Sequence, residues 1–136
     1  MKPKLHYVNL STKNVAEMTE FYKRILLLES EKGDIPVLEK NKAYSGDVEF
    51  MTDGTTQTHI AEMDLDLNFK TGLAINPLIK GHIAFRTENL EEFKRHLKLQ
   101  GINYSDWGET AVSGWKQVFF YDPDGNIVEV HQRNTD

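Results

Sequence analysis

The chain has 136 residues, of which 39% are hydrophobic and 10% are aromatic, and this is enough to build one domain with a buried core. No apolar run approaches the roughly 20 residues that a membrane-spanning helix needs, and the first residues contain no apolar segment typical of a secretion signal. The formal net charge of −5 gives no electrostatic reason to bind nucleic acid. Cysteine is absent, which excludes disulfides, thiolate metal sites and a cysteine nucleophile. We therefore expect a cytoplasmic protein that neither spans a membrane nor binds nucleic acid.

The first half of the chain predicts one helix and four strands. The expected elements are a strand at 5–10, a helix at 15–26, a strand at 27–31, and a β-hairpin with strands at 47–52 and 56–63. The helix is amphipathic, because its apolar residues recur near i, i+3, i+4 and i+7 behind the capping side chains of Thr12 and Asn14. The hairpin is predicted from Asp53-Gly54, which supplies the positive φ of a tight turn.

The second half of the chain predicts the same order of elements. A connector at about 66–80, which contains Gly72 and Pro77, separates the two halves. After it we expect a strand at 82–86, a helix at 90–100, and strands at 103–107, 115–121 and 126–132. Gly101 suits a left-handed cap at the end of the helix, and Asp122-Pro123-Asp124-Gly125 is a strong turn between the last two strands.

The repeated order indicates an internal duplication. Residues 12–15 align with residues 87–90, and the same register places Tyr7 opposite His82. We expect a single domain in which module one spans about 1–65 and module two spans about 81–136. A curved sheet from each module, covered by its helix on one side, leaves the other face free to line a small-molecule cavity.

Three segments carry a family resemblance: Phe21–Leu26 at the end of the first helix, Gly81–Phe85 in the fifth strand, and Asp122–Val130 in the last turn and strand. They are similar to segments of the vicinal oxygen chelate superfamily, which includes glyoxalase I, bleomycin-resistance proteins, fosfomycin-inactivating thiol transferases and extradiol dioxygenases. The resemblance implies an α/β (α+β) fold of two βαβββ modules, whose curved mixed sheets enclose a cavity with a divalent metal, commonly in a homodimer. Leu27 departs from the pattern, because the family usually has glycine after this helix.

Strand alternation selects the candidate site residues in the second module. Glu129 and His131 share one face of the last strand, while Val128 and Val130 face the helix layer. Glu129 therefore points into the cavity, where a carboxylate must be paired or bound to a cation. His82 faces the cavity from its own strand, and the pair resembles the C-terminal metal ligands of the family, suited to Zn, Ni, Mn or Fe. The alternative is a histidine hydrogen-bonded to a glutamate without a metal.

The first module departs from the family's ligand pattern. The repeat register puts Tyr7 in the cavity, where it binds substrate, ligates weakly or fills the core. His6 lies one residue earlier and is expected to point away, unless the strand contains a β-bulge.

The fourth strand offers further candidate site residues, and their side chains point to opposite faces of the sheet. Aligning the two Asp-Gly turns puts Gln57 near the place of Glu129 and His59 near that of His131. We expect His59 inside as a third metal ligand and Glu62 outside, with Gln57 lining the cavity as a substrate-binding residue. Gln117, in the seventh strand, is a third substrate-binding candidate beside Tyr7 and Gln57.

These residues support three hypotheses. The first is a divalent-metal-dependent lyase, isomerase or thiol transferase that acts on a small oxygen-bearing substrate, with Glu129 as ligand and catalytic base and with His82 and His59 as ligands. The second is a metal-free binding module similar to the bleomycin-resistance proteins, which the tyrosine at position 7 favours. The third is a metal-free enzyme that uses His82 and Glu129 as an acid–base pair. We also expect a homodimer in which module one of one chain abuts module two of its partner.

Overall fold

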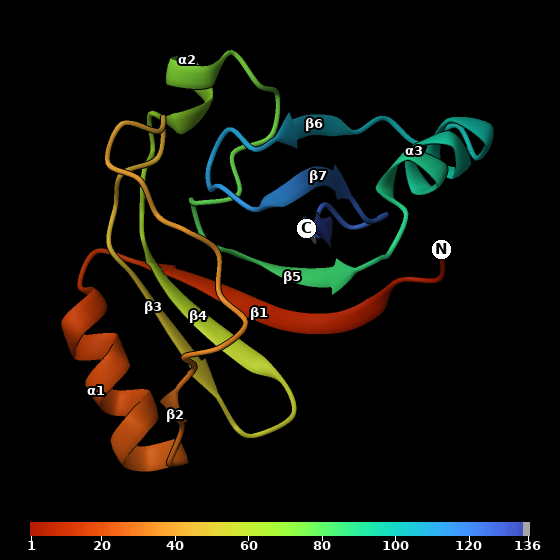
Figure 1. Ribbon diagram of the computed structural model, residues 1–136. Coiled ribbons are helices and arrows are strands. Elements are labelled where there is room, and N and C mark those ends of the chain that lie inside the picture. Colours follow the sequence, from red (N-terminus) through yellow and green to blue (C-terminus); the bar gives the residue numbers. More distant parts are fainter. Residues whose placement is uncertain (135–136) are drawn as a thin grey trace.

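The computed structural model describes residues 1–134 as two successive sets of one major helix and four strands (Figure 1). The first set comprises β1 (Lys4–Thr12), α1 (Val15–Leu26), β2 (Glu29–Ser30), β3 (Val48–Thr52) and β4 (Gln57–Glu62). The second comprises β5 (Gly81–Arg86), α3 (Leu90–Leu99), β6 (Ser105–Gly108), β7 (Trp115–Tyr121) and β8 (Ile127–Arg133). A short helix, α2 (Leu67–Thr71), lies in the segment that was expected to be a plain connector.

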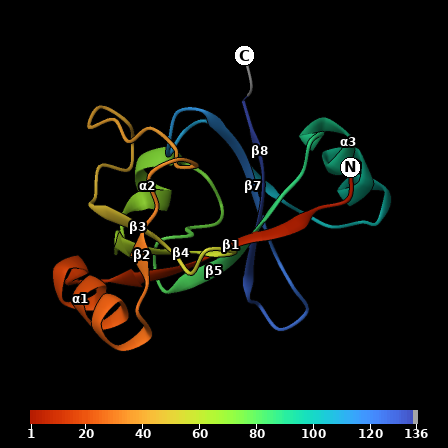
Figure 2. The same ribbon diagram turned by 60° about the horizontal axis from the view of Figure 1, so that its bottom comes forward.

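The eight strands form one continuous mixed sheet in the order β2-β3-β4-β1-β5-β8-β7-β6. The sheet is curved and open, with α1 and α3 on its outer side, as the two views in Figures 1 and 2 show. This confirms the predicted fold of two modules with curved mixed sheets.

The two modules join through the antiparallel pair β1 and β5 at the centre of the sheet. Tyr7 is opposite Ala84 and Asn9 is opposite His82, a symmetrical pairing that agrees with the register matching Tyr7 to His82. Gly81 permits the close approach, since a Cβ at this position would lie 2.5 Å from the carbonyl oxygen of Asn9. The two modules therefore pair within one chain through β1 and β5. The expected contact between module one and module two of a partner chain stays a prediction.

The helices begin at matching caps, which supports the duplication. The side chain of Asn14 accepts a hydrogen bond from the backbone N–H of Glu17 at 3.0 Å, and that of Asn89 accepts one from Glu92 at 3.0 Å. The two helices differ in burial. Leu90, Phe93 and Leu97 of α3 pack on β7 and β8, whereas α1 has no buried residue.

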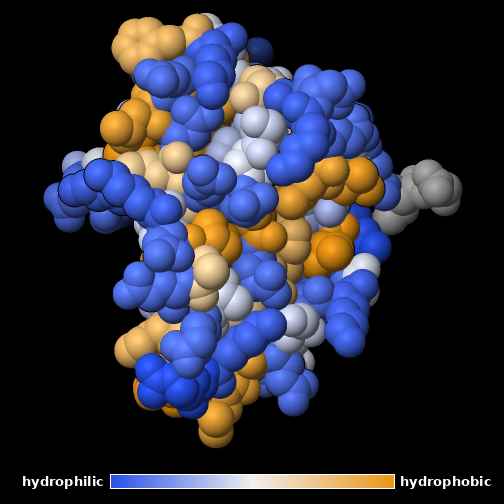
Figure 3. All heavy atoms as spheres, turned by 90° about the vertical axis from the view of Figure 1, so that its left-hand side faces the viewer, coloured by the Kyte–Doolittle hydropathy of each residue, from blue (hydrophilic) through white to orange (hydrophobic). Residues whose placement is uncertain are grey.

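The outer surface of α1 leaves apolar side chains in contact with solvent. Phe21, Ile25 and Leu26 are each about half exposed, at 47%, 49% and 55%. In the space-filling view of this side, apolar surface is visible at the lower end, at the height of α1 (Figure 3).

A long segment between β2 and β3 crosses the concave side of the sheet, and we call residues 31–47 the strap. Val37 and Ser113 exchange backbone hydrogen bonds of 3.1 Å, which tie the strap to the loop before β7. Near its end, the Tyr44 hydroxyl donates to the carbonyl oxygen of Glu62 at 2.6 Å. The strap thus spans from one module to the other and roofs the space between them.

The chain reverses after α1 through Leu27, which has a left-handed backbone (φ 61°, ψ 29°) at the position where the family usually has glycine. The reversal leaves β2 only two residues long instead of the expected strand over 27–31. A side chain in this conformation costs roughly 1–2 kcal/mol, and Leu27 recovers little of it by packing because it is 77% exposed.

We expect Leu27→Gly to raise the free energy of unfolding by roughly 0.5–1 kcal/mol, because glycine adopts this conformation without strain. The control is Leu26→Gly, at the neighbouring half-exposed helical position, which should lower stability by about 1 kcal/mol. Urea denaturation of the three proteins measures both effects. A loss of stability in Leu27→Gly would show that the leucine side chain makes contacts that outweigh its backbone strain.

Candidate functional site

The concave face of the sheet carries a buried polar cluster at the junction of the modules. Tyr7 comes from β1, His82 from β5, and Glu129 and His131 from β8. All of them are buried, and Glu129 and His131 have no measurable exposure. Strand alternation brings Glu129 and His131 to the same face, as the sequence predicts.

Glu129 is the centre of this cluster. Its Oε1 atom accepts a hydrogen bond of 2.6 Å from the Tyr7 hydroxyl and lies 3.1 Å from His82 Nε2, and its Oε2 atom lies 2.8 Å from His131 Nδ1. Burial alone would raise the pKa of Glu129, but the hydrogen bonds from His131 and His82 outweigh it and lower the pKa below its usual range. Glu129 is therefore a buried, ionised carboxylate.

The partners of the two histidine rings indicate which ring nitrogens donate, because carbonyl and carboxylate oxygens can only accept and a guanidinium N–H can only donate. His131 Nε2 accepts from the Nε–H of Arg86 at 3.1 Å, so His131 is neutral and donates to Glu129 through Nδ1–H. His82 Nδ1 lies 3.0 Å from the carbonyl oxygen of Pro77, which can only accept. For His82 also to donate from Nε2 to Glu129, its ring must carry both protons, which makes the contact an ion pair.

His59 lies on the other side of Tyr7. Its ring stacks on the Tyr7 ring with centroids 3.8 Å apart, and its Nε2 atom lies 2.7 Å from Gln57 Oε1. Burial lowers the pKa of His59 well below its usual value, so the ring is neutral and donates to Gln57. Tyr7 is also affected, since burial and then the charge of Glu129 raise the pKa of its phenol.

The structure places His59 inward and Glu62 outward, as expected from parity, but it corrects the register of β4. Asn9 pairs with His59 in the first module, and Ala84 pairs with Glu129 in the second. His59 therefore matches Glu129 and not His131. One more residue separates the turn glycine from the strand in the first module than in the second, which accounts for one residue of this shift.

His6 also lies on the concave side, so the expectation that it points away is wrong. A β-bulge between Leu5 and Tyr7 shifts the register at this residue. The His6 ring centroid is 5.0 Å from that of His131 and 5.4 Å from that of Trp115. Burial, followed by the charge of Arg86, lowers the pKa of His6 to about 4.

The cluster borders a small, mostly apolar cavity of about 60 Å³ under the strap. Its polar lining includes the predicted residues Tyr7, His59, His82, Gln117 and Glu129. Gln57, which was also expected there, does not line it and instead donates to the Asp34 carbonyl. Within residues 1–134, the Oε1 atom of Gln117 and the Nδ2 atom of Asn9 are buried without a hydrogen-bond partner. These two atoms can bind a polar guest. A wider hollow of about 670 Å³ lies beyond Asn9 and His82, which line both spaces.

The donor atoms fit a divalent metal only in part. His82 Nε2 and Glu129 Oε1 are 3.1 Å apart, a spacing suited to neighbouring ligands, and Pro77 orients the His82 ring as metal-bound histidines are oriented. His59, the expected third ligand, instead donates to Gln57 and is stacked on Tyr7. In residues 1–134, no three histidine or carboxylate side chains converge on one point.

A family model described as the Glyoxalase/Bleomycin resistance protein/Dioxygenase superfamily matches residues 4–130. The chain belongs to this superfamily. Proteins of known, curated function give no match to it. In the part of the chain that the structure describes, no helix combines the length and the apolar character needed to cross a bilayer.

Solved structures of the superfamily fold resemble this chain at low sequence identity. The hypothetical protein BH1468 from Bacillus halodurans C-125 is 15% identical with a TM-score of 0.72, over 100% of this chain and 98% of that one. Methylmalonyl-CoA epimerase from Mycobacterium tuberculosis is 14% identical with a TM-score of 0.70, over 96% and 88%. A methylmalonyl-CoA epimerase in complex with methylmalonyl-CoA and NH4+ is 16% identical with a TM-score of 0.69, over 99% and 97%. At these identities the similarity establishes the fold alone.

Sequence reasoning did not assign roles to His131, Arg86 or Asp34. His131 was detectable, because it shares the cavity face of β8 with Glu129. Arg86 ends the predicted fifth strand, but nothing in the sequence indicates that its Nε–H reaches His131. Asp34 lies in a polar loop whose path across the sheet has no sequence signal.

We expect His131→Phe to lower the free energy of unfolding by about 3 kcal/mol, because it removes the partner of Glu129 Oε2 and that of Arg86 Nε. Phenylalanine keeps the aromatic packing on Trp115, whose ring lies parallel to that of His131 at 4.6 Å. The matched control is His96→Phe on the exposed side of α3, which should change stability by less than about 0.5 kcal/mol. Equal effects in the two variants, measured by urea denaturation, would contradict the role given to His131.

Proposed function

We propose that the chain is an isomerase- or lyase-type enzyme that moves a proton on a small oxygen-bearing substrate in the central cavity. The observation that carries the proposal is the buried, ionised Glu129 carboxylate beside two hydrogen-bond donors, Tyr7 and His82, at the wall of an apolar cavity. A buried charge with this arrangement is costly for a purely structural role, and groups of this kind cluster at functional sites.

In this mechanism the Tyr7 hydroxyl and the His82 Nε2–H stabilise a substrate oxygen. Both donate to the same atom, Glu129 Oε1, so a substrate carbonyl oxygen placed there accepts two hydrogen bonds. Negative charge that develops on this oxygen when a neighbouring C–H bond breaks is stabilised by these donors. The second proton of His82, held by Pro77, keeps the ring in the orientation that this requires.

Glu129 takes the proton from the substrate carbon and returns it to the product. Its pKa is low because of the hydrogen bonds that it receives, and burial acts in the opposite direction. When a substrate oxygen takes the donors Tyr7 and His82, burial dominates and the carboxylate becomes a stronger base. Substrate binding thus activates the base. The reaction needs no other reactant, because the carbon regains one proton for the one that it loses, and the proton on Glu129 can exchange with solvent in between.

The similarity to methylmalonyl-CoA epimerase structures supports the reaction class, because epimerisation is a proton transfer at one carbon. The wider hollow beyond Asn9 and His82 offers room for the remainder of a larger substrate. We further propose that the protein works in the cytoplasm as a homodimer, for which the exposed apolar residues of α1 provide a contact surface.

A metal-dependent reaction is the second candidate, and one observation favours it. His82 is oriented by the Pro77 carbonyl with Nε2 facing Glu129, so these two residues would hold a divalent ion such as Zn, Ni, Mn or Fe. When bound, such an ion would act as a Lewis acid toward a substrate oxygen. Tyr7 donates to Glu129 and His59 donates to Gln57, so neither side chain completes such a metal site in this structure.

The proposed reaction is tested by deuterium exchange from D2O into a panel of small hydroxyketones and 2-substituted thioesters, followed by proton NMR. Wild-type protein should catalyse exchange of the proton next to the carbonyl of at least one compound. Glu129→Gln should lower the rate at least about 10²-fold, and Tyr7→Phe should lower it roughly 10²-fold. Glu62→Gln, an exposed carboxylate on β4, is the control and should retain the wild-type rate. Exchange that survives in Glu129→Gln would refute the proposal.

The metal content of protein purified without added metal or chelator separates the two candidates. The proposed mechanism predicts substoichiometric metal and exchange activity that persists after treatment with EDTA. Tyr7→His should raise the affinity for Zn²⁺, because it adds an imidazole beside His82 and Glu129. Stoichiometric metal in the wild type that is lost in His82→Ala would instead establish the metal-dependent candidate.

A further inference from the structure

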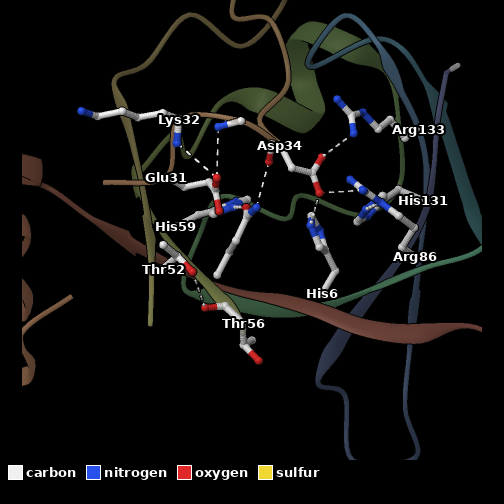
Figure 4. Close-up of polar contacts among 12 residues, drawn as sticks. His6, Glu31, Lys32, Asp34, Thr52, Thr56, His59, Arg86, His131 and Arg133 are labelled. Carbon is white, nitrogen blue, oxygen red and sulfur yellow. Dashed lines mark hydrogen bonds and ion pairs between the residues drawn. The ribbon is translucent and has the colours of Figure 1, made fainter. Parts of the chain in front are cut away.

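The strap inserts one carboxylate into the concave side of the sheet, and three elements bind it. Asp34 Oδ2 lies 3.0 Å from His6 Nε2 on β1 and 2.7 Å from Arg86 Nη1 on β5, and Asp34 Oδ1 lies 3.5 Å from Arg133 Nη1 on β8 (Figure 4). The backbone carbonyl of Asp34 also accepts a hydrogen bond of 2.8 Å from Gln57 Nε2. We call His6, Arg86 and Arg133 the carboxylate nest.

The nest has more binding capacity than Asp34 uses. Two guanidinium groups face one carboxylate, and Arg86 contacts it through Nη1 alone. In the described chain, Arg86 Nη2 is buried without a hydrogen-bond partner. Arginine matches a carboxylate best through two parallel N–H donors, so this single contact leaves the preferred geometry unfilled.

Arg86 connects the nest to the proposed reacting groups. Its Nε–H donates to His131 Nε2 at 3.1 Å, and His131 Nδ1–H donates to Glu129 Oε2 at 2.8 Å. Its guanidinium is held 5.0 Å from the centre of the Trp115 ring, and Trp115 lines the cavity. A group bound in the nest is therefore a short distance from the cavity and in a fixed orientation toward it.

The closed strap cannot be the state that binds substrate. The cavity of about 60 Å³ holds about two water molecules, whereas pockets for organic ligands occupy roughly 300–1,000 Å³. The strap roofs this cavity, and its contact through Asp34 must be released for a ligand to enter. On the outer side of the nest, Lys2, Lys4, His6 and Arg86 line a further hollow of about 410 Å³, with Glu88 as the acidic residue there. This positive surface attracts anions.

We propose that the carboxylate nest binds a carboxylate of the substrate, and that Asp34 occupies the place of this group while the strap is closed. The inference rests on the proposed function, because it assigns the substrate class to the same cavity: small carbonyl compounds that also carry a carboxylate. The substrate carboxylate displaces Asp34, takes both free donors of Arg86, and places the neighbouring carbon beside Glu129. Release of Asp34 opens the strap only when a carboxylate is present to replace it.

The test is the binding of malonate, measured by isothermal titration calorimetry, to the wild type and to Asp34→Asn. Removal of the competing carboxylate should tighten malonate binding on the order of tenfold, because the nest is then no longer occupied by a carboxylate of the protein itself. The control Asp47→Asn removes the same charge from an exposed position of the same strap and should leave the affinity unchanged. Malonamide, which is uncharged, should not bind measurably to any of these proteins.

Two further measurements show whether the nest itself binds the anion. Arg133→Gln, placed in the Asp34→Asn background, should weaken malonate binding more than about tenfold, and Arg133 is exposed enough for the variant to fold. In wild-type protein, malonate should speed the hydrogen exchange of the Val37 amide, which is bonded to Ser113 across the strap. This second readout needs no variant.

Malonate affinity that is equal in Asp34→Asn and Asp47→Asn, or that is unaffected by Arg133→Gln, would overturn the inference. These experiments distinguish a failure of the carboxylate nest from a failure of the proposed reaction. Malonate binding that depends on Arg133, together with no proton exchange on any carbonyl compound, would refute the reaction and support the nest. Proton exchange without any effect of Asp34→Asn on malonate affinity would refute the nest alone.

Discussion

The structure depends on the need to satisfy one buried carboxylate. An isolated ionised carboxylate in an apolar interior is strongly unfavourable, so Glu129 requires donors on each of its oxygens. Tyr7, His82 and His131 supply them from three neighbouring strands. This requirement constrains the sheet, because Tyr7 reaches Glu129 only if β1 and β5 pair with the observed register, and His82 reaches it only if β5 and β8 do. The junction of the two modules and the polar cluster around Glu129 therefore depend on the same strand pairing.

The duplication explains why the site lies where it does. Equivalent positions of the two modules carry Tyr7 and His82 on the first strand of each module, and His59 and Glu129 on the last strand. In module two these positions hold an imidazole and a carboxylate, whereas in module one they hold a phenol and a neutral imidazole. The phenol donates to Glu129 and thereby takes up a lone pair that a cation would otherwise use. Position 7 of this chain thus contributes a hydrogen-bond donor to the site, where the equivalent position in module two contributes an imidazole.

The fold and half of the site could be predicted from the sequence because their signals are local. Helix periodicity with capping asparagines located α1 and α3, and strand alternation oriented His82, Glu129 and His59. The failures involve longer-range geometry. A single bulge turned His6 inward, and an additional residue in the turn before β4 changed its register, so that His59 and not Gln57 matches Glu129. The strap and its Asp34 contact depend on a path across the sheet that no periodicity encodes.

The central claim is that hydrogen-bond donors hold Glu129, and the protonation of the histidine rings tests it most directly. Nitrogen-15 NMR of histidine-labelled protein distinguishes the two states of His82. We predict that both ring nitrogens of His82 carry protons and that His131 is neutral with its proton on Nδ1. A neutral His82 with an unprotonated Nε2 facing Glu129 would contradict the account, because the carboxylate would then lack the donor on which the proposed chemistry depends.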